Sequence, residues 1–217
     1  MSDPAFDPAT ARIVPMEDAD ALDVGRLYRD AIPWAIFSKL GDRFAGRFIL
    51  WIHQQERSRV WVARSAAGDI LGIMGGTLDR PAIYRKIVRE HLLGISFSVL
   101  LNLYRPGVLV WLFRALWECI RPAPDVPRSA PRPAAEGLFH AVVEQAKGTG
   151  LAQQLCARRE ADFRSWGYHG PYTILTLSTN ARANAFQKRL GGRLVAQIPT
   201  RGHLIYEWHK DVAPDGP

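Results

Sequence analysis

The stretch Lys147-Gly148-Thr149-Gly150-Leu151-Ala152 decides the fold of this chain. It follows an apolar run at 137–143 that is typical of a strand, and it opens a helical pattern that continues to residue 166. Glycine allows the backbone to approach a diphosphate closely, and the first amides of a helix have no acceptor within the helix. The helix dipole stabilises an anion at this end by about 0.3–1 kcal/mol, and Lys147 adds a mobile positive charge. The turn therefore predicts a phosphate-binding site, although a strand-to-helix turn that needs glycine only for its geometry would show the same pattern.

Two common nucleotide-binding motifs do not fit this turn. The Walker pattern Gly-x-x-x-x-Gly-Lys-Ser/Thr is missing, and so is the dinucleotide pattern Gly-x-Gly-x-x-Gly. The strand before the turn also lies late in the chain, whereas the dinucleotide motif follows the first strand of its domain. The sequence therefore predicts neither of these sites.

On both sides of the turn, the pattern is that of one domain made of strands and helices. Before it we expect a strand at 11–15, helices over 16–32 and 38–55, and strands at 60–63 and 70–77. After it we expect a strand at 172–177, a helix over 181–190 and a final strand pair at 193–198 and 202–208. With 217 residues, of which 47% are apolar and 23% charged, the chain suits a single domain over 1–217 with a proper core.

Two segments resemble the acyl-CoA N-acyltransferases of the GNAT superfamily. Ala141-Val142 and the glycine-rich turn are similar to the family's Gln/Arg-x-x-Gly-x-Gly/Ala motif, with Lys147 where Gln or Arg is usual. Residues 180–192, Asn-Ala-Arg-Ala-Asn-Ala-Phe-Gln-Lys-Arg-Leu-Gly-Gly, are similar to the family's Asn-x-x-Ala-x-x-Phe-Tyr-x-x-Leu-Gly-Phe. The resemblance covers 11–78 and 135–209. It implies an α/β (α+β) GNAT fold, with a mixed central sheet splayed between its fourth and fifth strands.

The resemblance also implies acetyl-CoA as co-substrate and no metal ion. The pantetheine arm would pair with backbone groups at 141–143 between the splayed strands, and the amides of the turn would hold the pyrophosphate. Asn180 would face the cofactor arm near the thioester. The implied cofactor-binding residues are Ala141, Val142, Val143, Lys147, Gly148, Thr149, Gly150, Leu151, Ala152, Asn180 and Phe186.

Two residues of the fourth strand are candidate catalytic bases. Only about one alkyl amine in a thousand is neutral at pH 7, because its pKa lies near ~10.4. Glu136 opens the strand where some GNAT members carry a catalytic glutamate, and His140 is the second candidate, with an ordinary pKa near ~6.5. Strand alternation predicts that Glu136, Leu138, His140 and Val142 share one face. A solvated carboxylate and a hydrogen-bonded core histidine are the structural alternatives for the two candidates.

Gln187 departs from the family pattern. A tyrosine often stands at this position and protonates the leaving CoA thiolate, which glutamine cannot do. Solvent could protonate a thiol of pKa ~8.5 instead. The other options are that Tyr168, Tyr172 or Tyr206 takes the role, or that catalysis is slow or lost.

Residues 79–134 are expected to form a helical hairpin and a Pro-rich linker inserted between the third and fourth core strands. A basic stretch at 84–91 continues into apolar residues 92–103, and a second apolar helix is expected over 108–120. Neither apolar run reaches the ~20 residues that span a bilayer. The hairpin would cover its own domain or a homodimer partner, contact a membrane surface through 80–120, or line a tunnel for a long acyl chain or a lipid-linked acceptor. With residues 34–44 it resembles a GNAT subgroup met among bacterial cell-surface polysaccharide enzymes, which implies an amino-sugar acceptor.

Charge and cysteines set weaker limits on function. The 28 Lys and Arg against 21 Asp and Glu give a net charge of +7, which suits an anionic ligand such as CoA. Cys119 and Cys156 form no metal-binding pattern, and residues 1–10 have no apolar signal segment, so we expect a cytoplasmic protein with reduced thiols.

The expected function is transfer of an acetyl group from acetyl-CoA to the primary amine of a small molecule by direct attack. A toxin-type acyltransferase acting on aminoacyl-tRNA and a non-catalytic CoA-binding module are the alternatives. Nucleic acid is not expected as a partner, because no Lys/Arg stripe with interleaved aromatic residues is present.

Overall fold

The computed structural model describes residues 11–102, 110, 126–200 and 202–214. Its strands form one mixed sheet in the order β1-β2-β3-β4-β5-β7-β6, in which every neighbouring pair is antiparallel except β4 and β5. The strands are β1 Arg12–Pro15, β2 Ser58–Arg64, β3 Ile70–Thr77, β4 Glu136–Val142, β5 Pro171–Leu177, β6 Arg193–Thr200 and β7 His203–Asp211. This topology confirms the expected α/β fold class and the order of the strands.

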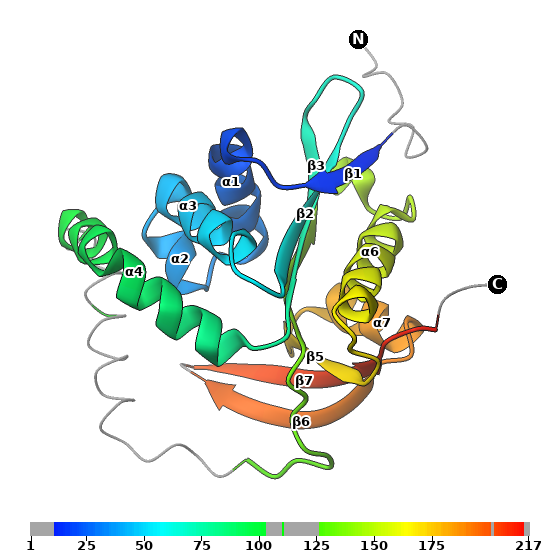
Figure 1. Ribbon diagram of the computed structural model, residues 1–217. Helices are drawn as coiled ribbons and strands as arrows, with labels where there is room; N and C mark the ends of the chain where they lie inside the picture. Colours follow the sequence, from blue (N-terminus) through cyan, green and yellow to red (C-terminus); the bar gives the residue numbers. More distant parts are fainter. Residues whose placement is uncertain (1–10, 103–109, 111–125, 201, 215–217) are drawn as a thin grey trace.

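Helices cover both faces of the sheet (Figure 1). On one side lie α1 Ala21–Ala31, α2 Ile36–Lys39, α3 Asp42–His53 and α4 Arg80–Leu101, and on the other lie α6 Leu151–Ser165 and α7 Ala181–Arg189. Short 3-10 helices, Asp18–Asp20 and Glu144–Ala146, precede α1 and α6. Separate apolar clusters fill the space between the sheet and each helical layer. We call these the α1/α3 face and the α6/α7 face.

The expectation of one continuous helix over 38–55 is wrong. Gly41 has a φ of 94°, which is not helical, so the helix breaks between the end of α2 at Lys39 and the start of α3 at Asp42. Beyond this break, α1 and α3 approach so closely that a Cβ on Gly46 would stand 1.6 Å from the carbonyl oxygen of Ala21. The break therefore lets α3 turn and pack backbone to backbone against α1.

The sheet is splayed between β4 and β5, as expected. Each strand has seven residues, but the two pair only at Glu136 with Thr173 and at Gly137 with Ile174. Beyond Gly137, β4 continues to pair with β3 as far as Val142, while its edge towards β5 has no strand partner. A gap therefore opens along β4 towards the glycine-rich turn.

The prediction that Glu136, Leu138, His140 and Val142 share one face of β4 is wrong. Gly76 pairs with Gly137 and Gly75 with Phe139, so Leu138 is an extra residue in a β-bulge. Leu138 and Phe139 both pack on the α1/α3 face. The bulge inverts the alternation after Gly137, so that Glu136 and His140 lie on opposite faces of the sheet.

Only part of the expected insertion falls within the described residues. The basic and apolar stretches at its start form α4, which consists of two helical segments that meet at a kink at His91. The second expected helix, 108–120, lies outside the described residues apart from residue 110. Residues 126–135 return to the sheet, where the Ser129 amide donates to the carbonyl of Val195 on β6 at 3.2 Å; we call this segment the strap. Among the described helices, none is long and apolar enough to cross a membrane.

Candidate active site

The glycine-rich turn is open on its outer side. Gly148 and Gly150 have φ angles of 85° and 89°, and a Cβ built on either would find no heavy atom within 4 Å. Gly150 precedes the first residue of α6, and Thr149 closes the turn from inside by donating to the carbonyl of Ala146 at 2.8 Å. The turn is thus an open helix N-terminus at the mouth of the gap. Its first amides lack acceptors within the helix, although the Leu151 amide donates to Thr149 Oγ1 at 3.4 Å.

Positive side chains surround this mouth. Lys147 forms a short ion pair with Glu144, and Arg182, at the start of α7, contacts the other oxygen of the same carboxylate at 3.3 Å. The hydrogen bond from Lys147 lowers the pKa of Glu144, which keeps this exposed carboxylate ionised. Lys147 and Arg182 are therefore held where an incoming anion could compete with Glu144 for them.

The expected cofactor-binding residues lie along both sides of the gap, but their backbone groups differ in availability. The Val143 amide already donates to Leu71, and its carbonyl accepts from Ala146. Ala141 and Val142 pair with β3 on one side only. Asn180 uses its side-chain oxygen to cap α7 through the Ala183 amide at 3.0 Å. Ala141 and Val142 are consequently the stronger candidates for binding a ligand in the gap.

Glu136 is buried at the closed end of the gap, on the α1/α3 face. One carboxylate oxygen lies 2.9 Å from Arg80 Nη1 and the other lies 3.0 Å from Arg132 Nη2. The solvated carboxylate weighed from the sequence is therefore not what the structure shows. Two guanidinium groups orient this side chain, and further lone-pair positions on its oxygens remain for a ligand or a water.

His140 lies on the α6/α7 face, against Phe186 of α7 with 5.5 Å between ring centroids. Its Nδ1 is 4.0 Å from Cys156 Sγ, and its Nε2 has no hydrogen-bond partner among the described residues. Burial, and secondarily the charge of Arg159, lower the pKa of His140 to about 3. The imidazole is therefore neutral across the physiological pH range.

The expected replacements for the missing tyrosine differ in availability. The hydroxyl of Tyr172 donates to Glu160 at 2.6 Å and accepts from Arg159 at 2.9 Å, and burial raises its pKa. The hydroxyl of Tyr168 donates to the carbonyl of Pro171. Tyr206 is half-buried beside Trp208. Tyr172 is thus committed to a structural network, and Tyr206 is the least committed of the three.

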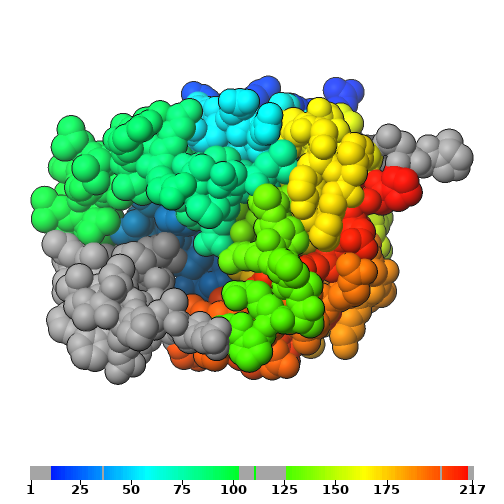
Figure 2. All heavy atoms as spheres, turned by 60° about the horizontal axis from the view of Figure 1, so that its bottom comes forward, coloured from blue at the N-terminus to red at the C-terminus, as the bar shows by residue number. Residues whose placement is uncertain are grey.

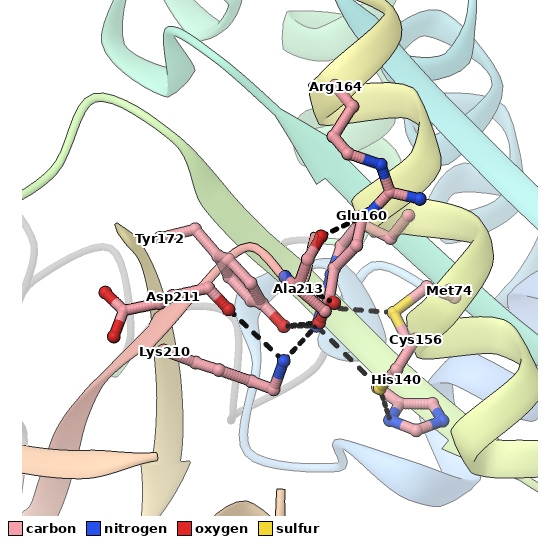
Figure 3. A network of polar contacts seen from close by, with 10 residues as sticks. Met74, His140, Cys156, Glu160, Arg164, Tyr172, Lys210, Asp211 and Ala213 are labelled. Carbon is pink, nitrogen blue, oxygen red and sulfur yellow. Dashed lines mark hydrogen bonds and ion pairs between the residues drawn. The ribbon is translucent and has the colours of Figure 1, made fainter. Parts of the chain in front are cut away.

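Sequence reasoning missed the network behind the closed end of the gap (Figure 3). Glu160 of α6 receives hydrogen bonds from Tyr172 and from Lys210, both at 2.6 Å, and from the Ala213 amide at 3.1 Å. The Arg159 guanidinium contacts Met74 Sδ at 3.1 Å and lies over the backbone of Gly137. The only sequence signal for this network was the glycine at positions 76 and 137. A Cβ at either position would collide with the Arg159 side chain, so glycine there indicates a close neighbour. The network ties β5, β7 and α6 together at the point where β5 separates from β4.

No group of three or more His, Cys, Asp and Glu side chains that could hold a metal ion occurs among the described residues. Cys156 is a free, buried thiol, and Cys119 lies outside the described residues.

Comparisons with known proteins agree with the geometry. No family model and no curated protein matches the sequence. Solved structures do match, among them a GCN5-related N-acetyltransferase from Kribbella flavida, with 19% identity, a TM-score of 0.56, and coverage of 94% of this chain and 99% of that chain. Ard1 from Thermoplasma volcanium has 15% identity, a TM-score of 0.59 and the same coverage. Salmonella typhimurium yncA, solved with its cofactor acetyl-CoA, has 14% identity, a TM-score of 0.55, and coverage of 96% and 97%. At these identities the likeness establishes the fold: this chain has the GNAT fold.

Proposed function

We propose that this protein is an acyl-CoA-dependent N-acyltransferase that moves an acetyl group from acetyl-CoA to the primary amine of a small molecule, with amino sugars among the candidate acceptors. The observation that carries the proposal is the gap between β4 and β5, which opens at an unobstructed glycine-rich helix N-terminus. Such a site suits a diphosphate at its mouth and an extended arm between the strands.

The cofactor would follow the two sides of this gap. Amides from Gly148 to Ala152 would hold the pyrophosphate, with Lys147 as a mobile cation. The open edge of β4 at Ala141 and Val142 would pair with the pantetheine arm, and Phe186 and Asn180 would line it from α7. The thioester would then lie near the bulge at Leu138, close to the closed end.

Glu136 would act as the base for the attacking amine. A neutral amine forms the new C–N bond at the thioester carbon, the C–S bond breaks, and the ammonium proton passes to Glu136 directly or through water. The thiolate leaves and takes a proton from solvent, which is easy for a thiol of pKa ~8.5. With a pKa of about 3, His140 is a weak base, so we assign it the lesser part of lining the cofactor arm.

The first experiment tests the cofactor site. Gly150→Asp puts bulk and negative charge where the diphosphate would bind, so acetyl-CoA affinity should fall by at least tenfold in calorimetry. Gly68→Asp is the matched control, because Gly68 also has a φ of 94° and open surroundings but lies in the β2–β3 hairpin. Equal affinity of both variants and the parent protein would overturn the assignment.

The second experiment tests the base. Glu136→Gln should lower turnover by roughly 10²-fold, the lower end of what a general base contributes, and leave acetyl-CoA affinity nearly unchanged. Release of free CoA thiol with a panel of amines measures turnover. Equal turnover of the variant at all pH values would remove Glu136 from the mechanism.

A non-catalytic CoA-binding module is the second candidate, because Gln187 is buried at the position where the resemblance to GNAT enzymes implies a tyrosine acid. Acetyl-CoA binding without thiol release in the amine panel would favour it. Binding of tRNA with a steep salt dependence would instead favour the aminoacyl-tRNA acyltransferase.

The exposed surface of α4 and the buried thiol of Cys156 bear on the partners and the location of the protein. We propose that α4 contacts a membrane surface or a second copy of the chain, since Leu93, Phe97 and Leu100 are exposed after its kink and the basic residues Arg85 and Lys86 are exposed before it. Liposome flotation at low salt and the oligomeric state in solution separate the two. A free, buried Cys156 fits a cytoplasmic location.

A further inference from the structure

The α1/α3 face carries a row of buried polar side chains that the proposed chemistry uses only in part. Strand register places Glu136 opposite Thr173 and Thr173 opposite His209, so the three share a face. Glu207 lies on the same face, because its Oε1 is 3.1 Å from His209 Nε2. All four are buried, and Thr173 Oγ1 has no hydrogen-bond partner among the described residues. Two carboxylates are therefore buried on the α1/α3 face, and one of them is the proposed base, Glu136.

Three partly exposed arginines form ion pairs with these two buried carboxylates. Arg80 of α4 and Arg132 of the strap bind Glu136, and Arg128 of the strap binds Glu207 at 3.2 Å. Each arginine side chain is about a third exposed, and a guanidinium has five donors. Each therefore keeps N–H groups for a further partner. Guanidiniums outnumber carboxylates three to two in this cluster as far as the structure describes it.

The two elements that carry the three arginines, α4 and the strap, border a hollow on the molecular surface. Figure 2 shows that α4, the strap and the β6–β7 hairpin border part of this hollow, with residues of the blue α1–α3 region at its floor. The Trp34 ring, between α1 and α2, lies 6.2 Å from His203 at the start of β7, which brings the helical layer and the hairpin together. A small molecule in the hollow would lie beside α4 and the strap, the two elements that carry the arginines.

We propose that Arg80, Arg128 and Arg132 form an oxyanion subsite of the acceptor pocket, so that the preferred acceptor is a small primary amine that also carries a carboxylate or a phosphate. This inference rests on the proposed acetyl transfer. Guanidinium groups bind both oxyanions bidentately, and the buried carboxylates hold them in place before the ligand arrives. Side chains ordered in advance lose less conformational entropy on binding, which favours affinity.

A purely structural role for these ion pairs predicts a different result. If they only tie the strap to the sheet, as the Ser129–Val195 hydrogen bond does, then loosening the strap changes KM for charged and neutral amines alike. A subsite changes the discrimination between them. The ratio of the two specificity constants therefore separates the two roles.

The experiment compares matched acceptors at saturating acetyl-CoA: glycine with glycinamide, and 2-aminoethyl phosphate with ethanolamine. We expect kcat/KM to be at least tenfold higher for the anionic member of one pair, and the pair with the larger ratio identifies carboxylate or phosphate as the oxyanion. Arg128→Gln and Arg132→Gln should each reduce that ratio about tenfold, mainly through KM, as the loss of one charge-assisted contact predicts. Arg26→Gln, which removes the same charge from an exposed pair with Asp23 on α1, should leave the ratio unchanged.

Ratios near one for both pairs, or unchanged ratios in both strap variants, would overturn the subsite while leaving acetyl transfer intact. If no amine is acetylated although acetyl-CoA binds, the proposed transfer fails. The subsite is then decided by calorimetric titration of the CoA-saturated protein with glycine and 2-aminoethyl phosphate. Binding that Arg132→Gln weakens about tenfold supports the subsite, and absent or unaltered binding contradicts it.

Discussion

The guanidinium of Arg159 occupies the space above the backbone of Gly137, so closely that a Cβ at position 137 would stand 2.3 Å from Nη1. Gly137 is the last residue of β4 that pairs with β5. A charged side chain from α6 is thus pressed against the point where the two strands part. The same guanidinium is held by Tyr172 and Met74, so it has little room to yield.

Gly137→Ala should therefore destabilise the protein. We expect a loss of about 1–3 kcal/mol in the free energy of unfolding, the usual cost of overpacking a buried site. Chemical denaturation measures it. Gly94→Ala is the matched control, because nothing lies within 4 Å of a Cβ there in α4, and it should be neutral or stabilising.

Arg159→Met tests the cause of that loss. If the clash with the guanidinium is responsible, the double variant Gly137→Ala/Arg159→Met should be more stable than the sum of the single effects by at least about 0.5 kcal/mol. Strict additivity would show that Arg159 is not what glycine accommodates at position 137.

Glu160→Gln should remove a pH-dependent part of the stability. Burial alone would raise the pKa of Glu160, but hydrogen bonds from Lys210 and Tyr172 outweigh it, so the folded-state pKa lies below its ordinary value of 4.5. A depressed pKa contributes stability that is present above the unfolded-state pKa and is lost as pH falls through the folded-state value. The parent protein should exceed the variant in stability at pH 7, and the difference should shrink between pH 5 and pH 3.

Denaturation at a series of pH values measures this difference. Glu56→Gln changes the same group at an exposed position and should show no such trend. A constant difference between parent and Glu160→Gln from pH 7 to pH 3 would contradict the linkage.

The chain pattern was enough to predict the element order, and the resemblance to GNAT enzymes implied the position of the gap. Hydrophobic periodicity and the glycine-rich turn are local signals, and the folded structure agrees with them. The helix α6 starts directly after Gly150, and β4 and β5 stop pairing after Gly137. The break at Gly41 was missed because an isolated glycine within a helical pattern is compatible with a continuous helix.

The site was harder to predict, because its details depend on contacts between distant residues. The bulge at Leu138 adjoins Gly75, Gly76 and Gly137, and glycine within a strand suggests a bulge without fixing its position; this bulge separates Glu136 from His140. The two arginines on Glu136 come from α4 and the strap, which no local pattern places beside β4. Neighbour-dependent features of this kind follow from tertiary packing and not from spacing along the chain.

His140→Gln should make the free energy of unfolding depend less on pH in the mildly acidic range. Burial lowers the pKa of His140 to about 3, against an ordinary value of 6.5. Between those values the unfolded state binds a proton that the folded state does not, so stability falls as pH decreases from 6.5 towards 3. The slope from this residue is at most about 1.4 kcal/mol per pH unit.

The parent protein should therefore lose more stability than His140→Gln between pH 7 and pH 5. His169→Gln, at an exposed position, is the control and should follow the parent. Parallel profiles for parent and His140→Gln would mean that the imidazole titrates normally, which would restore His140 as a candidate base.

Gln187→Met should separate stability from activity. Gln187 is buried, and its Oε1 has no hydrogen-bond partner among the described residues. Replacing an unsatisfied buried amide by an apolar side chain of similar length is expected to be neutral or stabilising. If the amide instead serves the cofactor, the variant should keep or gain thermal stability while its affinity for acetyl-CoA falls about tenfold, the size of one lost hydrogen bond of about 1.4 kcal/mol.

Asn184→Ala is the contrasting variant on the same helix. Asn184 is buried, and its side-chain amide is fully hydrogen-bonded. Its Oδ1 accepts from the Thr176 hydroxyl at 2.5 Å, and its Nδ2 donates to the carbonyls of Leu177 and Ser178. Its loss should lower stability by about 1–3 kcal/mol, because the partner groups are left buried and unpaired. If Gln187→Met instead lowers stability and leaves acetyl-CoA affinity unchanged, then Gln187 is a packing residue, and the cofactor arm lies away from this face of α7.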